Sequence, residues 1–273
     1  MEIYAAVKTF EYTGHVKEGV SARKEEDGAG RSMKKELSVV IPTFNEKENL
    51  KILIPNILEV FDRNSIDGEI IVVDDRSTDG SFEFLNEQKS LIPSLKVMIR
   101  KPPASISRAW YEGFDAAAKS IVVCIDGDLC HNPEYFPTML KKIEEFDMVI
   151  GSRYMRSRLN AMAEKSFFAV YMSVLGQFIT RLATGFEEYD TSHSFRMFKK
   201  DVFNKIKRDL KSEGNAFLLE FLYYAKKNGA KVVEIPIEYG KRVYGSTKLK
   251  VLKEGLRYLR LIVKLMFRRL FVP

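Results

Sequence analysis

The sequence predicts an α/β protein built on a mostly parallel sheet flanked by helices. Short apolar runs rich in β-branched residues alternate with longer segments in which apolar residues recur every three or four positions. Acids directly follow two of the most apolar runs, where strands of such sheets end at their ligand sites. With 273 residues, of which 45% are hydrophobic and 30% charged, the chain is long enough to bury a full core.

The apolar runs place the strands in order along the chain. We expect strands at residues 37–43, 69–73, 95–99, 121–125, 147–150 and 231–239. Helical spacing follows the first strand, from Leu50 to Phe61, and a second helix is expected to start near Ser81. In such a sheet the segments after the strands meet along one edge, where ligands bind.

Residues 121–133 carry the most informative motif. The predicted strand ends at Asp126 and Asp128, separated by Gly127, with no Lys or Arg beside them. Two carboxylates so close repel each other unless they share a cation, and oxygen ligands without a His or Cys cage suit Mg²⁺ or Mn²⁺. An ordinary turn is the alternative interpretation, since Asp and Gly are common in turns.

Positive charge is concentrated at the carboxyl-terminal end. Residues 241–273 contain ten Lys and Arg against one acid, whereas the whole chain has a net charge of +7. An apolar stripe repeats at intervals of three and four and runs beside a basic stripe. The apolar stripe is Leu249, Leu252, Leu256, Leu259, Val263, Met266 and Leu270.

This pattern predicts a basic amphipathic helix over residues 248–273. The helix is too charged to span a bilayer, but it suits the headgroup layer of an anionic membrane. The alternative is that the apolar stripe packs on the domain and the basic stripe is solvated. Nucleic acid is not expected as a partner, because few aromatic residues alternate with the basic ones.

Other features narrow the class of protein. Residues 1–35 mix charge and glycine without periodicity, so we expect a poorly ordered extension there. Cys124 and Cys130 form no disulfide framework, which indicates a reducing compartment. A dinucleotide dehydrogenase is the main rival for such a fold, but the first strand lacks the G-x-G-x-x-G turn of those enzymes.

Six motifs, from residue 41 to residue 248, occur in the order seen in the family-two glycosyltransferases. They are Ile41-Pro42-Thr43-Phe44-Asn45-Glu46, Val72-Val73-Asp74-Asp75, Asp126-Gly127-Asp128, Gly151-Ser152-Arg153-Tyr154, Asp190-Thr191-Ser192-His193-Ser194-Phe195-Arg196 and Arg242-Val243-Tyr244-Gly245-Ser246-Thr247-Lys248. The sequence most resembles the dolichyl-phosphate mannose synthases and their polyprenyl-phosphate relatives. The resemblance implies a Rossmann-like GT-A domain over residues 36–247.

The resemblance also implies a nucleotide-diphosphate-sugar donor and a polyprenyl phosphate acceptor. By analogy, the nucleoside-binding residues are Pro42, Phe44, Glu46, Val73 and Asp75. Asp126 and Asp128 would bind the metal, with Gly127, Arg153 and Lys248 at the diphosphate.

This chain departs from the family pattern at four places. The glycine-rich turn expected before the helix at Trp110 reads Ser105-Ile106-Ser107. Phe44 replaces the usual Tyr, which removes a hydroxyl but keeps a ring for stacking. Cys130 stands where one branch has a metal-binding Gln, and a thiol is a poor Mg²⁺ ligand, so water or His131 is expected to complete the shell. The second phosphate-binding Arg expected after Arg153 has no clear counterpart, with Lys165 as a weak candidate.

The chemistry requires stabilisation of a departing nucleoside diphosphate. The resemblance places the metal and the basic groups Arg153, Arg196, Arg242 and Lys248 in this role. A lipid monophosphate, with its second pKa near ~6, needs no general base, and we expect single displacement with inversion.

Several readings stay open. A sugar hydroxyl acceptor would need a base, for which Asp190 and Glu220 are the candidates. Arg196 is as consistent with an ordinary ion pair to Asp190 as with a phosphate contact.

We therefore expect a peripheral enzyme at the cytoplasmic face of a membrane. It would transfer a hexose, with mannose from GDP-mannose as first choice, to a polyprenyl phosphate in the presence of Mg²⁺ or Mn²⁺. The alternatives are a UDP-sugar donor, a saccharide hydroxyl acceptor, and a non-catalytic protein that binds sugar nucleotides or nucleic acid.

Overall fold

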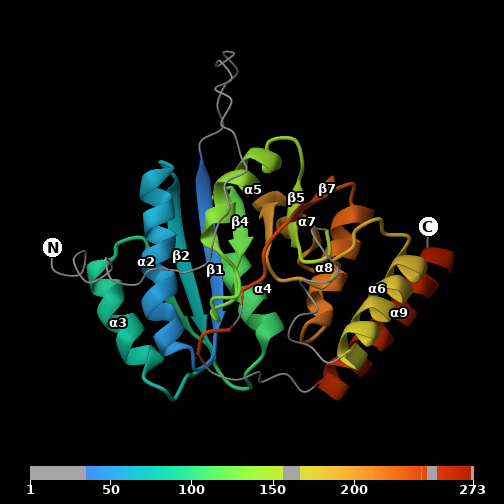
Figure 1. The fold of residues 1–273 in the computed structure, drawn as a ribbon, viewed down its shortest axis with the longest axis horizontal. Coiled ribbons are helices and arrows are strands. Elements are labelled where there is room, and N and C mark those ends of the chain that lie inside the picture. Colours follow the sequence, from blue (N-terminus) through green and yellow to red (C-terminus); the bar gives the residue numbers. More distant parts are fainter. Residues whose placement is uncertain (1–34, 156–166, 241, 245–250, 272–273) are drawn as a thin grey trace, which may run out of the picture. The chain divides into compact units, whose positions relative to one another are not determined.

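One seven-stranded sheet organises the chain, in the order β3-β2-β1-β4-β6-β5-β7 (Figure 1). The computed structural model describes residues 35–155, 167–240, 242–244 and 251–271. The strands are β1 (Glu36–Thr43), β2 (Asp67–Asp74), β3 (Leu95–Ile99), β4 (Ile121–Cys124), β5 (Met148–Ser152), β6 (Arg196–Lys199) and β7 (Val232–Pro236). Only β6 is antiparallel to its neighbours β4 and β5, and every other neighbouring pair is parallel. The predicted α/β fold with a mostly parallel sheet is confirmed.

Helices cover both faces of this sheet. They are α2 (Lys47–Arg63), α3 (Ser81–Leu91), α4 (Ile106–Ala116), α5 (Phe136–Ile143), α6 (Phe167–Thr184), α7 (Lys200–Ile206), α8 (Ala216–Lys227) and α9 (Val251–Phe271), with a short 3₁₀ helix at Pro133–Tyr135. The first helix shows why the sequence pattern works, because Leu50, Leu53 and Ile57 fall on one side of α2 and are fully buried.

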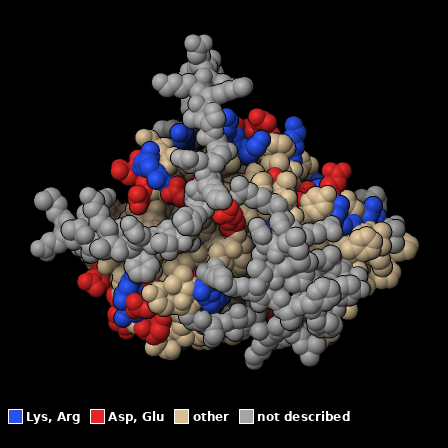
Figure 2. All heavy atoms as spheres, in the orientation of Figure 1, with Lys and Arg blue, Asp and Glu red and all other residues tan. Residues whose placement is uncertain are grey.

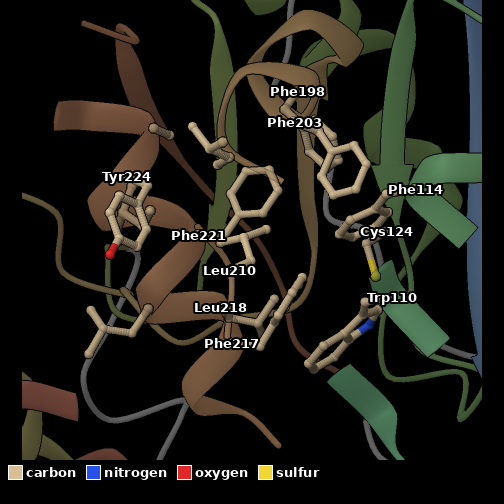
Figure 3. Packing of buried hydrophobic residues seen from close by; sticks show 14 of the residues in the cluster. Trp110, Phe114, Cys124, Phe198, Phe203, Leu210, Phe217, Leu218, Phe221 and Tyr224 are labelled. Carbon is tan, nitrogen blue, oxygen red and sulfur yellow. The ribbon is translucent and has the colours of Figure 1, made fainter. Parts of the chain in front are cut away.

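Alternate residues of each strand enter different core layers. In β1, Val39 joins the layer that includes α2 and α5, whereas Val40 joins the layer that includes α4 and α8. Aromatic side chains fill this second layer, and Figure 3 shows Phe114 of α4 pointing toward Phe198 of β6 and Phe221 of α8. The ring centroids of Phe114 and Phe198 lie 5.0 Å apart in an edge-to-face arrangement. These layers hold the strand ends in fixed positions.

Strand β6 was not predicted. It spans only four residues, of which two are apolar, so it shows no strand periodicity of its own. Its hydrogen-bonded neighbours on both sides bury it all the same. Because β6 runs against its neighbours, its amino end lies at the same edge as the carboxyl ends of the other strands. We call this edge of the sheet the rim.

The helix expected at residues 248–273 is present as α9, which packs along α6 and α8 (Figure 1). Its buried face is formed by Leu261, Ile262 and Leu265. The members of the predicted apolar stripe whose side chains the structure describes are exposed: Leu256 50%, Leu259 53%, Val263 41% and Met266 37%. The alternative in which that stripe packs on the domain is therefore wrong. Within the described ranges, no helix is both long and apolar enough to cross a membrane.

Candidate active site

The predicted motifs meet at the rim. Asp126 follows β4, Arg153 follows β5, and the segment before β6 contributes Ser194. The hydroxyl of Ser194 donates to a carboxylate oxygen of Asp126 over 2.7 Å. Arg242, on the loop after β7, donates to Asp128 over 2.8 Å. Segments that are up to 196 residues apart, from Glu46 to Arg242, thus share one site.

The two central aspartates, of which Asp128 is buried and Asp126 partly buried, have few hydrogen-bond donors. Asp128 accepts the backbone N–H of Cys130 at 3.1 Å in addition to Arg242. Burial raises the pKa of Asp126, and the nearby negative charge of Asp128 raises it further. The site therefore favours any cation that approaches both carboxylates.

Oxygen-preferring divalent ions fit this pair of carboxylates. In the part of the chain that the structure describes, no set of three His, Cys, Asp or Glu side chains is placed to hold a metal. Burial raises the pKa of Cys130 to about 12, so its thiol stays neutral, and both ring nitrogens of His131 are engaged elsewhere. His131 therefore does not complete a metal shell as we expected. Asp126 and Asp128 would hold Mg²⁺ or Mn²⁺ together with water and donor oxygens.

Two buried histidines lie directly behind Asp126. The Nδ1 atom of His131 accepts the backbone N–H of Asp126 at 3.1 Å, and its Nε2 atom lies 3.0 Å from Nε2 of His193. Nδ1 of His193 lies 2.6 Å from the carbonyl oxygen of Gly151. Burial lowers the pKa of both imidazoles, so both rings are neutral.

The loop after β7 crosses the rim and brings Arg242 to it. The backbone N–H of Gly240 donates to the carbonyl oxygen of Cys130 over 2.8 Å, which ties this loop to the segment after β4. Arg242 then lies between two acids, 2.8 Å from Asp128 and 3.6 Å from Glu46. The predicted convergence of Glu46, Asp128 and Arg242 is present, while Lys165 and Lys248 lie outside the described residues.

Arg153, which we expected at the diphosphate, is held at the rim by Asp190. Its guanidinium makes a two-pronged contact with Asp190, with both distances 2.8 Å. Burial lowers the pKa of Arg153, but the charge of Asp190 outweighs this effect and the net shift is upward. Glu234 accepts the backbone N–H of Asp190 at 2.8 Å and so fixes the loop that carries it. An ion pair between Asp190 and Arg196, one of our two readings, does not form.

Arg196 is buried inside the scaffold behind the rim. Its guanidinium donates to three backbone carbonyl oxygens, those of His193 (2.6 Å), Leu218 (2.8 Å) and Thr191 (3.4 Å). Burial lowers the pKa of Arg196 to about 10. The side chain is fully shielded from solvent, so its position favours a structural role over the predicted contact with a diphosphate.

Both candidate bases for a hydroxyl acceptor are also engaged. Asp190 is held by Arg153, as described. Glu220 is fully buried on α8, where one oxygen accepts the backbone N–H groups of Lys211 (2.7 Å) and Ser212 (2.6 Å). Neither carboxylate is placed to take a proton from a substrate at the rim.

The predicted nucleoside residues lie at the ends of β1 and β2. Pro42 and Val73 are register partners whose side chains are buried, so only their backbone reaches the rim. Phe44 is 40% exposed and offers a ring face to a base. Asp75 accepts the backbone N–H of Ser105 at 2.7 Å and forms an ion pair with Arg100.

Sequence reasoning missed several of these contacts. Arg100 directly follows β3, so its place at a strand end was a usable signal. The pairing of His131 with His193 carried no such signal, because the two are 62 residues apart and neither has a metal-type partner at helical spacing. Gly127, which was expected at the diphosphate, lies beside Glu46. A methyl group added to Gly127 would be 3.7 Å from the Cβ atom of Glu46.

Comparison with known proteins identifies the family. Residues 38–207 match the description of Glycosyl transferase family 2. The chain belongs to this family. It is therefore a glycosyltransferase, and the acidic rim is the place where family members of this fold are expected to act.

Three curated relatives of this family 2 glycosyltransferase can be compared with it individually. A dolichol-phosphate mannosyltransferase from Pyrococcus furiosus is 34% identical over 238 residues, which are 84% of this chain and 63% of that protein. The chain thus spans less than two thirds of the length of this relative. An undecaprenyl-phosphate mannosyltransferase from Micrococcus luteus is 27% identical, over 77% of this chain and 86% of the relative. A polyprenol monophosphomannose synthase from Mycolicibacterium smegmatis is 29% identical, over 77% and 80% respectively.

Solved structures show the same fold at lower identity. Glucosyl-3-phosphoglycerate synthase from Mycobacterium tuberculosis, in complex with Mn²⁺, UDP and phosphoglyceric acid, has a TM-score of 0.61 and 16% identity, over 88% of this chain and 80% of the other. The same enzyme has also been crystallised with Mg²⁺ and UDP, with a TM-score of 0.59 and the same coverage. This similarity shows the fold alone.

Proposed function

We propose that this glycosyltransferase moves a hexose, mannose from GDP-mannose, to a polyprenyl phosphate with inversion at the anomeric carbon. The observation that carries the proposal is the meeting of Asp126, Asp128 and Arg242 at a rim where the two candidate bases, Asp190 and Glu220, are both held by other partners. The relatives support the acceptor and the sugar, because all three names combine mannose with a phosphate of a long-chain lipid alcohol.

The reaction needs charge stabilisation more than proton transfer. An oxygen of the acceptor phosphate attacks the anomeric carbon while the bond from that carbon to the donor diphosphate breaks. Asp126 and Asp128 would hold a divalent ion, which supplies positive charge to the leaving diphosphate. Arg242 supplies further positive charge from the β7 loop, and Arg153 stays fixed by Asp190. We assign Arg196 to the scaffold only.

A donor and acceptor panel tests this proposal. The protein is incubated with GDP-mannose, UDP-glucose or other sugar nucleotides, with Mg²⁺ or Mn²⁺, and with polyprenyl phosphate or the corresponding free alcohol. We expect a lipid-linked hexose only with the phosphate lipid, detected by mass spectrometry. A product on the alcohol or on a saccharide would overturn the acceptor assignment. A product from UDP-sugars alone would overturn the choice of donor.

The outer face of α9 is the proposed membrane contact. Leu256 is 50% and Leu259 53% exposed, and Arg260 and Lys264 lie on exposed positions of the same helix. Apolar and cationic groups on one exposed helix match an anionic bilayer surface better than a protein core. Phe178 and Leu182, at 62% and 72% exposure, extend this apolar surface onto α6, which packs along α9. A polyprenyl phosphate would reach the enzyme from such a surface.

Charge elsewhere argues against a nucleic-acid partner. Figure 2 shows Lys and Arg interspersed with Asp and Glu over the described part of the face in view. Vesicle flotation tests the proposed membrane contact of α9, with anionic and neutral vesicles compared at low and high salt. We expect flotation with anionic vesicles and its loss in Leu259→Asp. Equal flotation of Leu259→Asp and the unchanged protein would exclude α9 as the contact.

A further inference from the structure

A buried chain of hydrogen bonds runs behind the carboxylate pair and joins the ends of β4 and β5. It passes from the backbone N–H of Asp126 through His131 and His193 to the carbonyl oxygen of Gly151. Both imidazoles are almost fully buried, at 2% and 3% exposure. The ring of His131 also stacks on Phe195, with centroids 5.0 Å apart and an interplanar angle of 13°. The orientation of this ring is therefore fixed by packing as well as by hydrogen bonds.

The two ends of the chain fix both tautomers. A carbonyl oxygen only accepts, so Nδ1 of His193 carries the hydrogen and its Nε2 is bare. A backbone N–H only donates, so Nδ1 of His131 is bare and its Nε2 carries the hydrogen. The middle contact is then a hydrogen bond from Nε2 of His131 to Nε2 of His193, and every ring nitrogen has a partner. Reversing either tautomer would set two donors or two acceptors against each other.

We infer that His131 and His193 are positioning residues that set the aim of Asp126 toward the divalent ion. The inference rests on the proposed function of the rim. The segment before β6 holds Asp126 twice, because His193 reaches its backbone through His131 and the adjacent Ser194 donates to its carboxylate at 2.7 Å. Gly151, at the other end, lies two residues before Arg153, so one connected unit spans both charged segments of the rim.

A purely apolar filling would serve packing equally well. Two buried imidazoles carry four polar nitrogens that must each find a partner, which is a cost unless their orientation is needed. Groups that orient metal-binding side chains from behind typically change metal affinity or activity by ~10–100-fold when they are removed. The hydrogen-bond pattern and the metal affinity are therefore both measurable consequences.

The first test reads the tautomers in the unmodified protein without donor or metal. The chain has three histidines in all, so a long-range ¹H–¹⁵N spectrum contains three rings, and His15→Gln removes the one outside the described residues. We expect one ring protonated at Nε2 only, assigned to His131, and one protonated at Nδ1 only, assigned to His193. Two identical tautomers, or a doubly protonated ring at neutral pH, would overturn the proposed chain of hydrogen bonds.

The second test compares two substitutions of His131 by titrating Mn²⁺ calorimetrically in the presence of GDP or UDP. His131→Phe keeps a ring to stack on Phe195 but removes both hydrogen bonds, and we expect the Mn²⁺ dissociation constant to rise about tenfold. His131→Asn can still accept the backbone N–H of Asp126, so it should recover most of that loss. Melting temperatures of both variants report any purely structural effect separately.

The outcomes distinguish a failure of the positioning role of the two histidines from a failure of the proposed sugar transfer. Equal Mn²⁺ affinity in His131→Phe and the unchanged protein would refute the positioning role, whatever sugar is transferred. Equal losses in His131→Phe and His131→Asn would also refute it, because the hydrogen bond to Asp126 would then not matter. Absence of lipid-linked product in the unchanged protein, with both histidine tests as expected, would refute the proposed reaction and leave the metal-positioning role in place.

Discussion

The two ends of the parallel strands hold acidic side chains in different ways. We call the amino ends of these strands the amino edge, as the carboxyl ends form the rim. At the amino edge, Glu69 accepts hydrogen bonds from Ser38 (2.5 Å) and from the backbone N–H of Ala118 (2.6 Å), and pairs with Lys96 at 2.6 Å. Burial alone raises the pKa of Glu69, but these three partners together lower it below its usual value. The charge is therefore stabilised within the fold itself.

At the rim the balance is reversed. Burial raises the pKa of Asp126 and the nearby carboxylate of Asp128 raises it further, while the hydroxyl of Ser194 lowers it only in part, so the net shift is upward. An acid with a full set of donors stabilises the fold, whereas an acid that lacks them stabilises whatever cation arrives. This contrast separates structural from ligand-binding carboxylates in a protein where both kinds end or begin strands.

The largest expected effect comes from one conservative change made at both edges. Asp128→Asn should lower transfer about a thousandfold, because loss of a carboxylate that we propose to bind the metal would remove about 4 kcal/mol of transition-state stabilisation. Asp147→Asn is the matched control, since Asp147 precedes β5 at the amino edge and pairs with Lys199 at 3.0 Å. The rate of product formation, followed by mass spectrometry, checks both. Similar losses in the two variants would break the contrast.

The pair of Arg153 and Asp190 should give the largest change in stability. Arg153→Met leaves the fully buried Asp190 without its partner, and we expect a loss of about 3–5 kcal/mol in the free energy of unfolding. Adding Asp190→Asn should recover much of that loss, because no unpaired charge remains. Urea unfolding of both single variants and the double variant measures the coupling. Additive losses would show that the two side chains do not depend on each other.

Acid should reveal the contribution of Glu69. Because its pKa is lowered in the folded protein, its stabilisation is fully present above the unfolded pKa of about 4.3 and is lost as the pH falls through the folded value. Glu69→Gln should therefore cost about 1–2 kcal/mol at pH 7 and progressively less below pH ~4. Urea unfolding across this range checks the sign. A constant difference at every pH would mean that the charge of Glu69 contributes nothing.

The smallest effect has the opposite sign. The raised pKa of Asp126 means that its ionised form is disfavoured in the folded protein, so the cost appears as the pH rises through the unfolded and then the folded value. Asp126→Asn should raise stability at pH 7 by roughly 0.5–1 kcal/mol, as when a strained functional site is relieved, and by less at pH 3. Melting temperatures at the two pH values provide the measurement. Destabilisation at pH 7 would show that Asp126 is a structural acid like Glu69.

Sequence alone predicted most of the rim because its acids lie at the ends of strongly apolar strands. Asp126, Asp128 and Glu46 could be placed that way, since parallel strands end at one edge whatever their order. The partners of Arg153 and Arg196 could not. Their pairing depends on the position of the segment before β6, which follows from the insertion of β6 between β4 and β5.

The residues by which α9 packs on the domain were equally out of reach. Periodicity found the helix with its predicted apolar stripe and its basic stripe. The side chains that face the domain form another apolar stripe, made of Leu261, Ile262 and Leu265. When a helix carries two apolar stripes, the sequence alone does not tell which of them packs on the domain. That depends on the neighbouring helices, which here are α6 and α8.

The reversed direction of β6 has a consequence for how such enzymes can diversify. Chain arriving from α6 enters the sheet at the rim, while chain leaving β4 and β5 exits there, so incoming and outgoing connections face the same substrate. The incoming connection, residues 185–195, carries Asp190, which holds Arg153, and Ser194, which donates to Asp126. A change of length within this connection would therefore displace charged groups at the rim even where the hydrogen-bonded register of the central strands is preserved.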